Sequence, residues 1–373
     1  MLDAQRLDAQ RADDGRARCA AILADVLRNS LARCSVFVAT LTLAGCASAP
    51  LAADAGQDAA APTDARVTDA SLDEGTVDAD GGAHVDLGVV PPADAGSACP
   101  PRPLQGLFVW NDDLVETRDE ILALAEARGV TEIYLHANLF YAGDRDESAL
   151  AAWIEAAGAR CIAVELLFGN ADWLLPAGRA DATSRTAWAV AFADAHPGAR
   201  PSGVHWDLEP QQLAAWHADV TTQPGFVSDL VDTLEVLTPV AEAGGLPLSI
   251  DLGFFFDGID VTRGGVTRPG SQWVTDAVSR VVLMDYRDTA LSTGHGGLIS
   301  LAEAEVVYAS AVGVPIVLAV ETTPQDPTYV SFAEEGFAAM IAELAVVRAH
   351  FASASAFAGT ALHDRDGVAA LAP

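Results

Sequence analysis

Residues 203–210 read Gly-Val-His-Trp-Asp-Leu-Glu-Pro, and apolar and ionisable side chains alternate along them. In a strand, the Val, Trp and Leu of this stretch fall on one face, and His205, Asp207 and Glu209 fall on the other. Burying three ionisable groups costs free energy unless they are paired or used. The stretch therefore predicts a buried strand whose polar face carries chemistry.

Comparable apolar runs recur about eight times after residue 104, and helical stretches separate them. This alternation is typical of parallel βαβ units, and eight units over residues 104–373 have the size of a (β/α)₈ (TIM) barrel. An open doubly wound sheet is the alternative, and the lack of a Gly-rich phosphate turn disfavours it. The predicted strands cover residues 106–110, 132–138, 160–167, 203–209, 246–253, 280–288, 314–321 and 355–363, and helices are predicted over 115–128, 147–157, 182–196, 226–243 and 332–350.

Residues 34–46 form a short apolar run near the start of the chain. A bilayer span needs about 20 residues, so a run of this length is typical of the apolar region of a signal peptide. Its last residues, Leu-Ala-Gly-Cys46, resemble the bacterial lipobox, which implies cleavage before Cys46 and a lipid on that cysteine. We therefore predict a lipoprotein signal peptide over 1–45, whose true start can lie downstream of Met1. The protein is then exported and lipid-anchored to the cell envelope, at the outer membrane or cell surface.

Residues 46–103 are dominated by Ala, Asp, Gly and Pro. A segment with so few large apolar side chains cannot bury enough surface to offset its ordering entropy. We predict a disordered tether there. The formal charge of the whole chain is −31, from 21 basic and 52 acidic residues, which argues against nucleic acid as a partner. We expect a monomer with no cofactor.

The chain has five cysteines, and cleavage before Cys46 leaves Cys99 and Cys161 as the two without an assigned role. In an oxidising compartment these two can pair as a disulfide. Two free buried thiols are the equal alternative. No Cys/His spacing indicates a zinc site.

Polar and aromatic side chains end most of the predicted strands. In a barrel, catalytic groups come from the carboxyl ends of the strands, so we expect these residues to meet at one rim. A barrel built only for stability would have Val, Ile and Leu in these places. Besides Asp207 and Glu209, the candidates are Glu321 and Tyr286 for catalysis and Trp110, Asn111, His136, Asn138, Glu165, Trp173, His205, Asp251, Asp288 and His363 for substrate binding, with Trp110 and Trp173 as stacking platforms for sugar rings.

Two motifs carry a resemblance to a known family. Asp207-Leu-Glu209 and Met284-Asp-Tyr286 resemble the strand-four D-x-x-D-x-D-x-E and strand-six M-x-Y motifs of the family 18 chitinase-like glycoside hydrolases. The resemblance implies that Glu209 is the general acid, that Asp207 orients an N-acetyl group of the substrate, and that Tyr286 binds that group. Ser202 and His205 stand where the family has aspartates, so we expect a distant relative of these glycosidases.

A second glycosidase mechanism uses Glu209 and Glu321. Retaining barrels of the large clan A type place an acid/base Glu before Pro at the end of strand four and a nucleophilic Glu at the end of strand seven. Glu209-Pro210 and Glu321 resemble that arrangement. The sequence therefore leaves open whether Asp207 or Glu321 is the second carboxyl group that glycoside hydrolysis requires.

Two other classes of protein remain as alternatives. The first is a non-catalytic surface barrel that binds carbohydrate, because fold alone never implies activity. The second is a metal-dependent hydrolase in which His136, Glu165, His205 and Asp207 converge on a cation. The absence of an H-E-x-x-H motif disfavours the metal-dependent enzyme.

Overall fold

The computed structural model describes residues 99–291 and 294–372. The predicted signal peptide, Cys46 and most of the predicted tether lie outside the described residues. The last five tether residues, 99–103, lie within them. They are attached to the barrel by a Cys99–Cys161 disulfide and by a hydrogen bond of 2.8 Å from Arg102 to the Cys161 carbonyl. Of the two open alternatives for the cysteines, the structure shows the disulfide.

Eight parallel strands form a closed barrel, which confirms the predicted (β/α)₈ fold. The eight strands pair in chain order around the barrel, and the first and last strands close the ring through the pairing of Leu104 with Gly359. The strands are β1 (Leu104–Val109), β2 (Glu132–His136), β3 (Ala163–Gly169), β4 (Gly203–Asp207), β5 (Leu248–Gly253), β8 (Arg280–Met284), β9 (Ile316–Glu321) and β10 (Phe357–His363).

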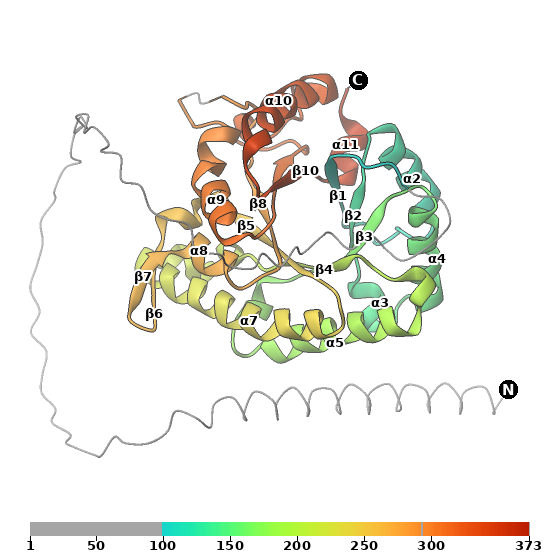
Figure 1. Cartoon of the computed structure of the whole chain (residues 1–373), viewed down its shortest axis with the longest axis horizontal. Coiled ribbons are helices and arrows are strands. Elements are labelled where there is room, and N and C mark those ends of the chain that lie inside the picture. The colour runs from blue at the N-terminus through green and yellow to red at the C-terminus, as the bar shows by residue number, and fades with distance from the viewer. Residues whose placement is uncertain (1–98, 292–293, 373) are drawn as a thin grey trace, which may run out of the picture. The chain divides into compact units, whose positions relative to one another are not determined.

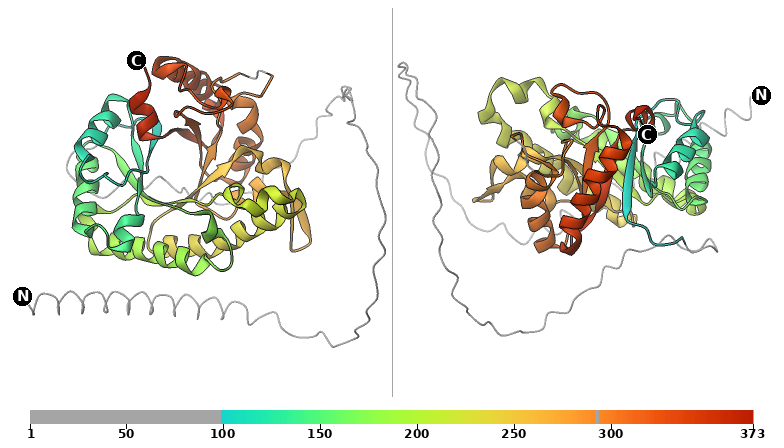
Figure 2. Two further views of the ribbon diagram at one scale, coloured as in Figure 1. Left: turned by 180° about the vertical axis from the view of Figure 1, so that it is seen from behind. Right: turned by 90° about the horizontal axis from the view of Figure 1, so that it is seen from above.

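Helices surround the barrel, as Figure 1 and the reverse view in Figure 2 show. A two-stranded hairpin, β6 (Asp260–Arg263) with β7 (Val266–Pro269), lies outside it beside α8. The helices are α2 (Arg118–Ala127), α3 (Asn138–Ala142), α4 (Glu147–Gly158), α5 (Arg179–Ala195), α6 (Ala214–Ala218), α7 (Gln223–Ala243), α8 (Gly270–Thr275), α9 (Leu298–Val312), α10 (Gly336–His350) and α11 (Arg365–Ala370), with 3₁₀ turns η1 (Ala171–Leu174), η2 (Pro197–Ala199), η3 (Pro210–Gln212), η4 (Val220–Thr222), η5 (Phe254–Gly258), η6 (Thr328–Val330) and η7 (Phe351–Ser353).

Four of the predicted strands run too long at the carboxyl end, those over 106–110, 132–138, 203–209 and 280–288, and the last two bear most on the site. The strand predicted over 280–288 ends at Met284, and the one predicted over 203–209 ends at Asp207. Asp285 still donates its backbone N–H to Ala319, at 3.0 Å, before the chain leaves the ladder. The side chains that follow these two strands therefore lie above the ladder, on connecting segments at the barrel mouth.

The core has two layers, as alternation along the strands predicts. The larger layer lies between the strands and the helices, and it contains Trp206 of β4, which packs 5.2 Å from the Phe168 ring. The smaller layer fills the barrel interior. Its members are Phe108, Tyr134, Leu167, Val282, Val317, Ala319 and Ala361.

Two glycines make room for large groups inside the barrel. A Cβ atom at Gly203 would lie 2.6 Å from a carboxylate oxygen of Glu165, and one at Gly106 would lie 2.8 Å from the ring of Tyr134. Real Cβ contacts are not that short, so only glycine fits at these two positions. The barrel interior thus holds a large aromatic and a charged side chain beside the usual branched aliphatic ones.

Candidate active site

A pocket opens at the carboxyl ends of the strands. Its volume is about 110 Å³. Six of the residues expected at the rim line it, and apolar surface comes from Met284 of the strand-six motif and from Phe108, which the sequence analysis had not singled out. The six are Trp110, Asp207, Glu209, Asp251, Tyr286 and His363.

Strand β4 brings Asp207 and Glu209 to this pocket. Asp207 is the last residue of the strand, and Glu209 follows just before η3, whose first residue is Pro210. The intervening Leu208 is fully buried in the outer layer. Glu209 lies close enough to Asp207 to raise the pKa of the Asp207 carboxyl group.

The surroundings favour the protonated form of both groups. Burial, then the charges of Glu209 and Asp251, raises the pKa of Asp207 well above its usual value. Burial and the charge of Asp251 also raise the pKa of Glu209. Hydrogen bonds from the Gln211 and Gln212 side-chain amides hold the Glu209 carboxyl group in place. A carboxyl group whose pKa is raised holds its proton more strongly, as a general acid requires.

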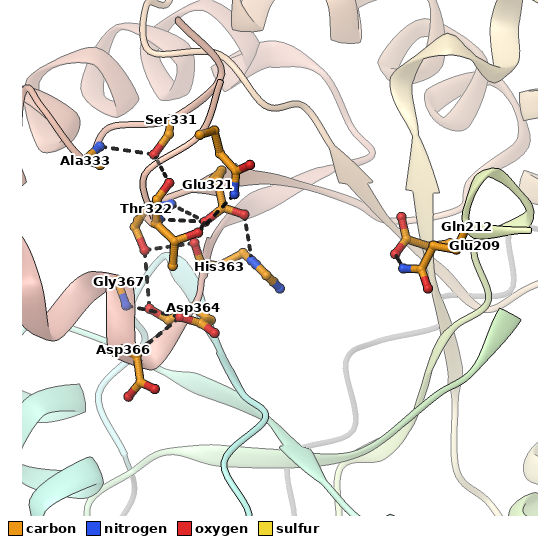
Figure 3. A network of polar contacts seen from close by, with 12 residues as sticks. Glu209, Gln212, Glu321, Thr322, Ser331, Ala333, His363, Asp364, Asp366 and Gly367 are labelled. Atoms are coloured by element: carbon orange, nitrogen blue, oxygen red, sulfur yellow. Dashed lines mark hydrogen bonds and ion pairs between the residues drawn. The ribbon is translucent and has the colours of Figure 1, made fainter. Parts of the chain in front are cut away.

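Glu321 has a different environment. One of its oxygens accepts hydrogen bonds from the backbone N–H groups of Thr322 and Thr323, at 2.8 and 2.7 Å, and from the Thr323 hydroxyl. The other lies 2.9 Å from Nδ1 of His363. Burial opposes ionisation, but His363 and Thr323 outweigh it and lower the pKa of Glu321. Figure 3 shows this cluster on the opposite side of the barrel opening from Glu209.

Glu165 and His205 do not lie at the rim, which corrects their prediction as substrate-binding residues. Glu165 is the third residue of β3 and pairs in register with Gly203, the first residue of β4. The side chains of Glu165 and His205 are buried in the barrel interior beneath the pocket. Oε2 of Glu165 lies 3.3 Å from Nδ1 of His205. Burial would raise the pKa of Glu165, but Arg280 and His205 outweigh it and lower it to about 2.

The two predicted sugar platforms differ in position. Trp110 lines the pocket, and its ring covers Gly169, where a Cβ atom would lie 2.6 Å away. Trp173 is only 8% exposed and packs edge-on against Trp206 in the outer layer, under the guanidinium of Arg185. Because η1 turns Trp173 away from the mouth, it is not available as a platform, and that prediction is corrected.

Asn111 and His136 lie beside the pocket without lining it. The Asn111 amide donates to Asp366 of α11 at 3.0 Å. Nδ1 of His136 lies 3.1 Å from the Trp110 carbonyl, and the two rings are 5.4 Å apart. The contacts of His136 hold Trp110 in place. Asn111 connects the segment after β1 to α11.

Asn138 and Asp288 also lie outside the pocket lining. Asn138 begins α3, directly above β2, and its side-chain oxygen is buried without a hydrogen-bond partner among the described residues. Asp288 follows β8 by four residues and bonds Tyr329 through its backbone N–H, at 3.1 Å. Its distance along the chain from the end of β8 explains why the predicted position at the strand end was wrong.

The four residues considered as metal ligands do not converge. Over residues 99–291 and 294–372, no group of three or more His, Cys, Asp and Glu side chains has the geometry to hold a metal ion. His136 contacts Trp110, whereas Glu165 and His205 are paired within the barrel. The metal-dependent alternative therefore has no ligand set among the described residues.

The sequence analysis missed a second buried acidic pair. Asp285 and Glu305 are at most 3% exposed, and no hydrogen bond reaches the oxygens of Asp285 within the described part of the chain. Burial and the charge of Asp257 raise the pKa of Glu305 to about 7. Asp285 sits between Met284 and Tyr286 in the sequence, so its outward direction follows from strand alternation alone.

No family model matches the chain, and no curated protein matches it in sequence. Among solved structures, it is similar to a chitinase from Chromobacterium violaceum ATCC 12472, with 14% identity and a TM-score of 0.42 over 72% of this chain and 98% of that one. The catalytic domain of β-amylase from Paenibacillus polymyxa shares 11% identity, with a TM-score of 0.45 over 71% and 92%. D-psicose 3-epimerase from Clostridium cellulolyticum H10 shares 11% identity, with a TM-score of 0.40 over 69% and 84%.

Proposed function

We propose that the protein is a glycoside hydrolase in which Glu209 is the general acid and Asp207 the second carboxyl group. The observation that carries this proposal is that Asp207 and Glu209 line the same pocket at the barrel mouth. Hydrolysis of a glycosidic bond needs one protonated carboxyl group beside the leaving oxygen and a second carboxyl group nearby. Trp110 and Tyr286 give the same pocket the aromatic surface on which sugar rings stack.

In this mechanism Glu209 donates its proton to the leaving oxygen as the bond to the anomeric carbon breaks. Water then adds to that carbon, and its proton returns to Glu209. For an N-acetylated hexosamine, Asp207 would accept a hydrogen bond from the acetamido N–H while the acetamido oxygen attacks the anomeric carbon. Tyr286 lines the pocket beside the pair and would bind the same group. The substrate is then a glycan or oligosaccharide that contains such a sugar.

The contacts of Glu321 favour Asp207 as the second carboxyl group. A nucleophile needs an oxygen free to attack, and both oxygens of Glu321 already accept hydrogen bonds or an ion pair. Glu321 also does not line the pocket. We assign it the role of holding His363.

The test is hydrolysis of a panel of aryl glycosides and glycan oligomers by the full chain and by three variants. Glu209→Gln should lower kcat/KM by about 10²–10⁴-fold, because it removes the acid without changing shape. Asp207→Asn should also lower it strongly, and Glu321→Gln should lower it least. Wild-type activity in Glu209→Gln would overturn the assignment.

A non-catalytic carbohydrate-binding barrel is the second candidate. The observation that favours it is the pair of amides, from Gln211 and Gln212, that occupy both oxygens of Glu209. If the protein retains glycan oligomers on an affinity column and hydrolyses none of them, this second function replaces the first.

We also propose that the protein is exported, lipid-anchored through Cys46 and monomeric. The Cys99–Cys161 disulfide supports export, because disulfides persist in oxidising compartments. Mass spectrometry of the mature N-terminus should find a lipid on Cys46, and Cys46→Ala should release the protein from membranes. An unmodified Cys46 in a membrane fraction would contradict the anchor.

A further inference from the structure

A chain of charged side chains runs through the barrel interior and ends at the pocket. At the amino ends of the strands, Arg280 of β8 makes two hydrogen bonds to Glu132, at 2.9 and 2.8 Å, and an ion pair of 2.6 Å with Glu165. The other oxygen of Glu165 lies 3.3 Å from Nδ1 of His205. Nε2 of His205 lies 2.9 Å from Asp251, which lines the pocket.

The contacts of His205 require a proton on both ring nitrogens. Its Nδ1 faces Glu165 and its Nε2 faces Asp251, and ionised carboxylates only accept hydrogen bonds. The Ser249 hydroxyl donates to Glu165, so at 2.9 Å it accepts from Nδ1 of His205. Burial would lower the pKa of His205, but Asp251 and Glu165 outweigh it and raise it to about 9. His205 is therefore a cation at neutral pH.

Aromatic packing fixes the orientation of this cation. The Tyr134 ring lies 4.4 Å from the His205 ring, and Phe108 meets it edge-on at 5.5 Å. His205 is fully buried, so water does not replace either carboxylate contact. The pairing with Asp251 is thus built into the barrel and does not depend on a mobile segment.

Asp251 faces the pocket with an unused oxygen. The residue is 4% exposed, and its Oδ1 has no hydrogen-bond partner among the described residues. Three groups of the pocket lie within the electrostatic reach of Asp251, and its charge raises the pKa of each of them. They are Asp207, Glu209 and Tyr286. Gln212, His363 of β10 and Asp207 act in the opposite direction and lower the pKa of Glu209.

We propose that Asp251 acts on the reacting groups through its negative charge, and that His205 is the positioning residue that holds Asp251. His205 holds the Asp251 carboxyl group in place through its Nε2, at 2.9 Å. The negative charge of Asp251 then keeps the proton on the Asp207–Glu209 pair and stabilises the positive charge that develops on the sugar ring as the glycosidic bond breaks. This inference rests on the proposed glycosidase function and adds a third carboxyl group to it.

The kinetic test compares Asp251→Asn and His205→Gln with a matched control, Glu305→Gln, which removes a buried carboxyl group outside the pocket. In the pH profile of kcat/KM, the fall in activity at high pH (the high-pH limb) reports deprotonation of Glu209. In Asp251→Asn it should move to lower pH by about one unit, because the amide has no charge to retain the proton. Loss of transition-state stabilisation should also lower kcat more than it raises KM.

His205→Gln should move the same limb in the same direction although Asp251 is intact. Without His205, Asp251 loses the hydrogen bond that fixes its carboxyl group beside the pair, so its charge acts less on Glu209. The double variant should shift the limb no further than Asp251→Asn alone, because both substitutions act on Glu209 through the same charge, that of Asp251. Glu305→Gln should leave the limb unchanged. An unshifted limb in Asp251→Asn would overturn the proposal and leave a purely structural ion chain.

A spectroscopic test separates this inference from the proposed function and needs no substrate. In the full-length wild type, ¹⁵N signals should show both ring nitrogens of His205 protonated at pH 7.5, and a neutral ring would overturn the proposal even if no variant folds. The ¹³C carboxyl titration of Glu209 should move to lower pH in Asp251→Asn. If that midpoint moves while no glycan is hydrolysed, the electrostatic inference stands and the glycosidase assignment fails.

Discussion

Nδ1 of His363 lies 2.9 Å from Oε2 of Glu321, and only the histidine of this pair lines the pocket. Glu321 is thus a carboxylate that orients and charges its neighbour. Burial would lower the pKa of His363, but Glu321 outweighs it and raises it. Glu321, which ends β9 and which the sequence left open as a nucleophile, therefore positions His363 beside the pocket and favours its protonated form.

Glu321→Gln should therefore impair catalysis far less than Glu209→Gln. We expect kcat/KM to fall by about tenfold, the effect of losing one charged hydrogen-bond partner. The pKa of His363 should fall toward its ordinary value, which an NMR titration of its ring would measure. Azide should not restore activity to Glu321→Ala, and formation of a glycosyl azide product would instead identify Glu321 as a nucleophile.

Trp110→Ala should weaken substrate binding. The ring lines the pocket and is held by Gly169 and His136, so it is preorganised for stacking on a sugar. Loss of the ring should raise KM roughly tenfold, with a smaller effect on kcat. Trp173→Phe is the control, because Trp173 packs in the outer layer, and its KM should match that of wild type.

Removal of the disulfide should lower stability without affecting the site. Cys99 and Cys161 are 62 residues apart, and closing a loop of that length stabilises the folded state by about 4 kcal/mol in the chain-entropy model. Cys99→Ser should therefore lower Tm by roughly 10 °C. Cys161 precedes β3, at the opposite end of the strands from the pocket, so kcat/KM at 25 °C should be unchanged.

A reducing agent provides the control for that prediction. It should lower the Tm of the wild type to that of Cys99→Ser and leave the variant as it is. A variant with an unchanged Tm would show that the disulfide does not stabilise the barrel.

Glu305 should make stability depend on pH. Its pKa is raised to about 7 in the folded protein from 4.5, so the folded state binds more protons than the unfolded state between these values. The free energy of unfolding then falls as the pH rises from 4.5 to about 7, by on the order of 3 kcal/mol. Glu305→Gln should remove this slope and be the more stable form at pH 8. Denaturant unfolding at pH 5 and pH 8 measures both, and an equal slope in wild type and variant would contradict the assignment.

Local patterns were sufficient for the barrel. The alternation of apolar runs with helical stretches predicted all eight strands, and the period-two pattern of residues 203–210 placed Trp206 outside and Asp207 inside, as observed. Both features depend on neighbours in the chain, where burial of one face sets the register. The ends of the strands were less predictable, because the loss of ladder hydrogen bonds after Met284 depends on the neighbouring strand.

The depth of a side chain along the barrel axis could not be predicted from the sequence. Glu165 and His205 carry the same chemistry as the rim residues, but the stagger between strands places them beneath the pocket, where Arg280 and Asp251 pair with them. Likewise, the sequence around Trp110 and Trp173 does not show which of the two lies at the pocket. It also does not show that the oxygens of Glu321 contact Thr322, Thr323 and His363. The sequence by itself determined the fold and which side chains of a strand face the barrel interior, because periodicity is a property of one strand. Only the tertiary structure decided which charges meet and which remain free for substrate, because strand stagger and contacts between distant segments set those distances.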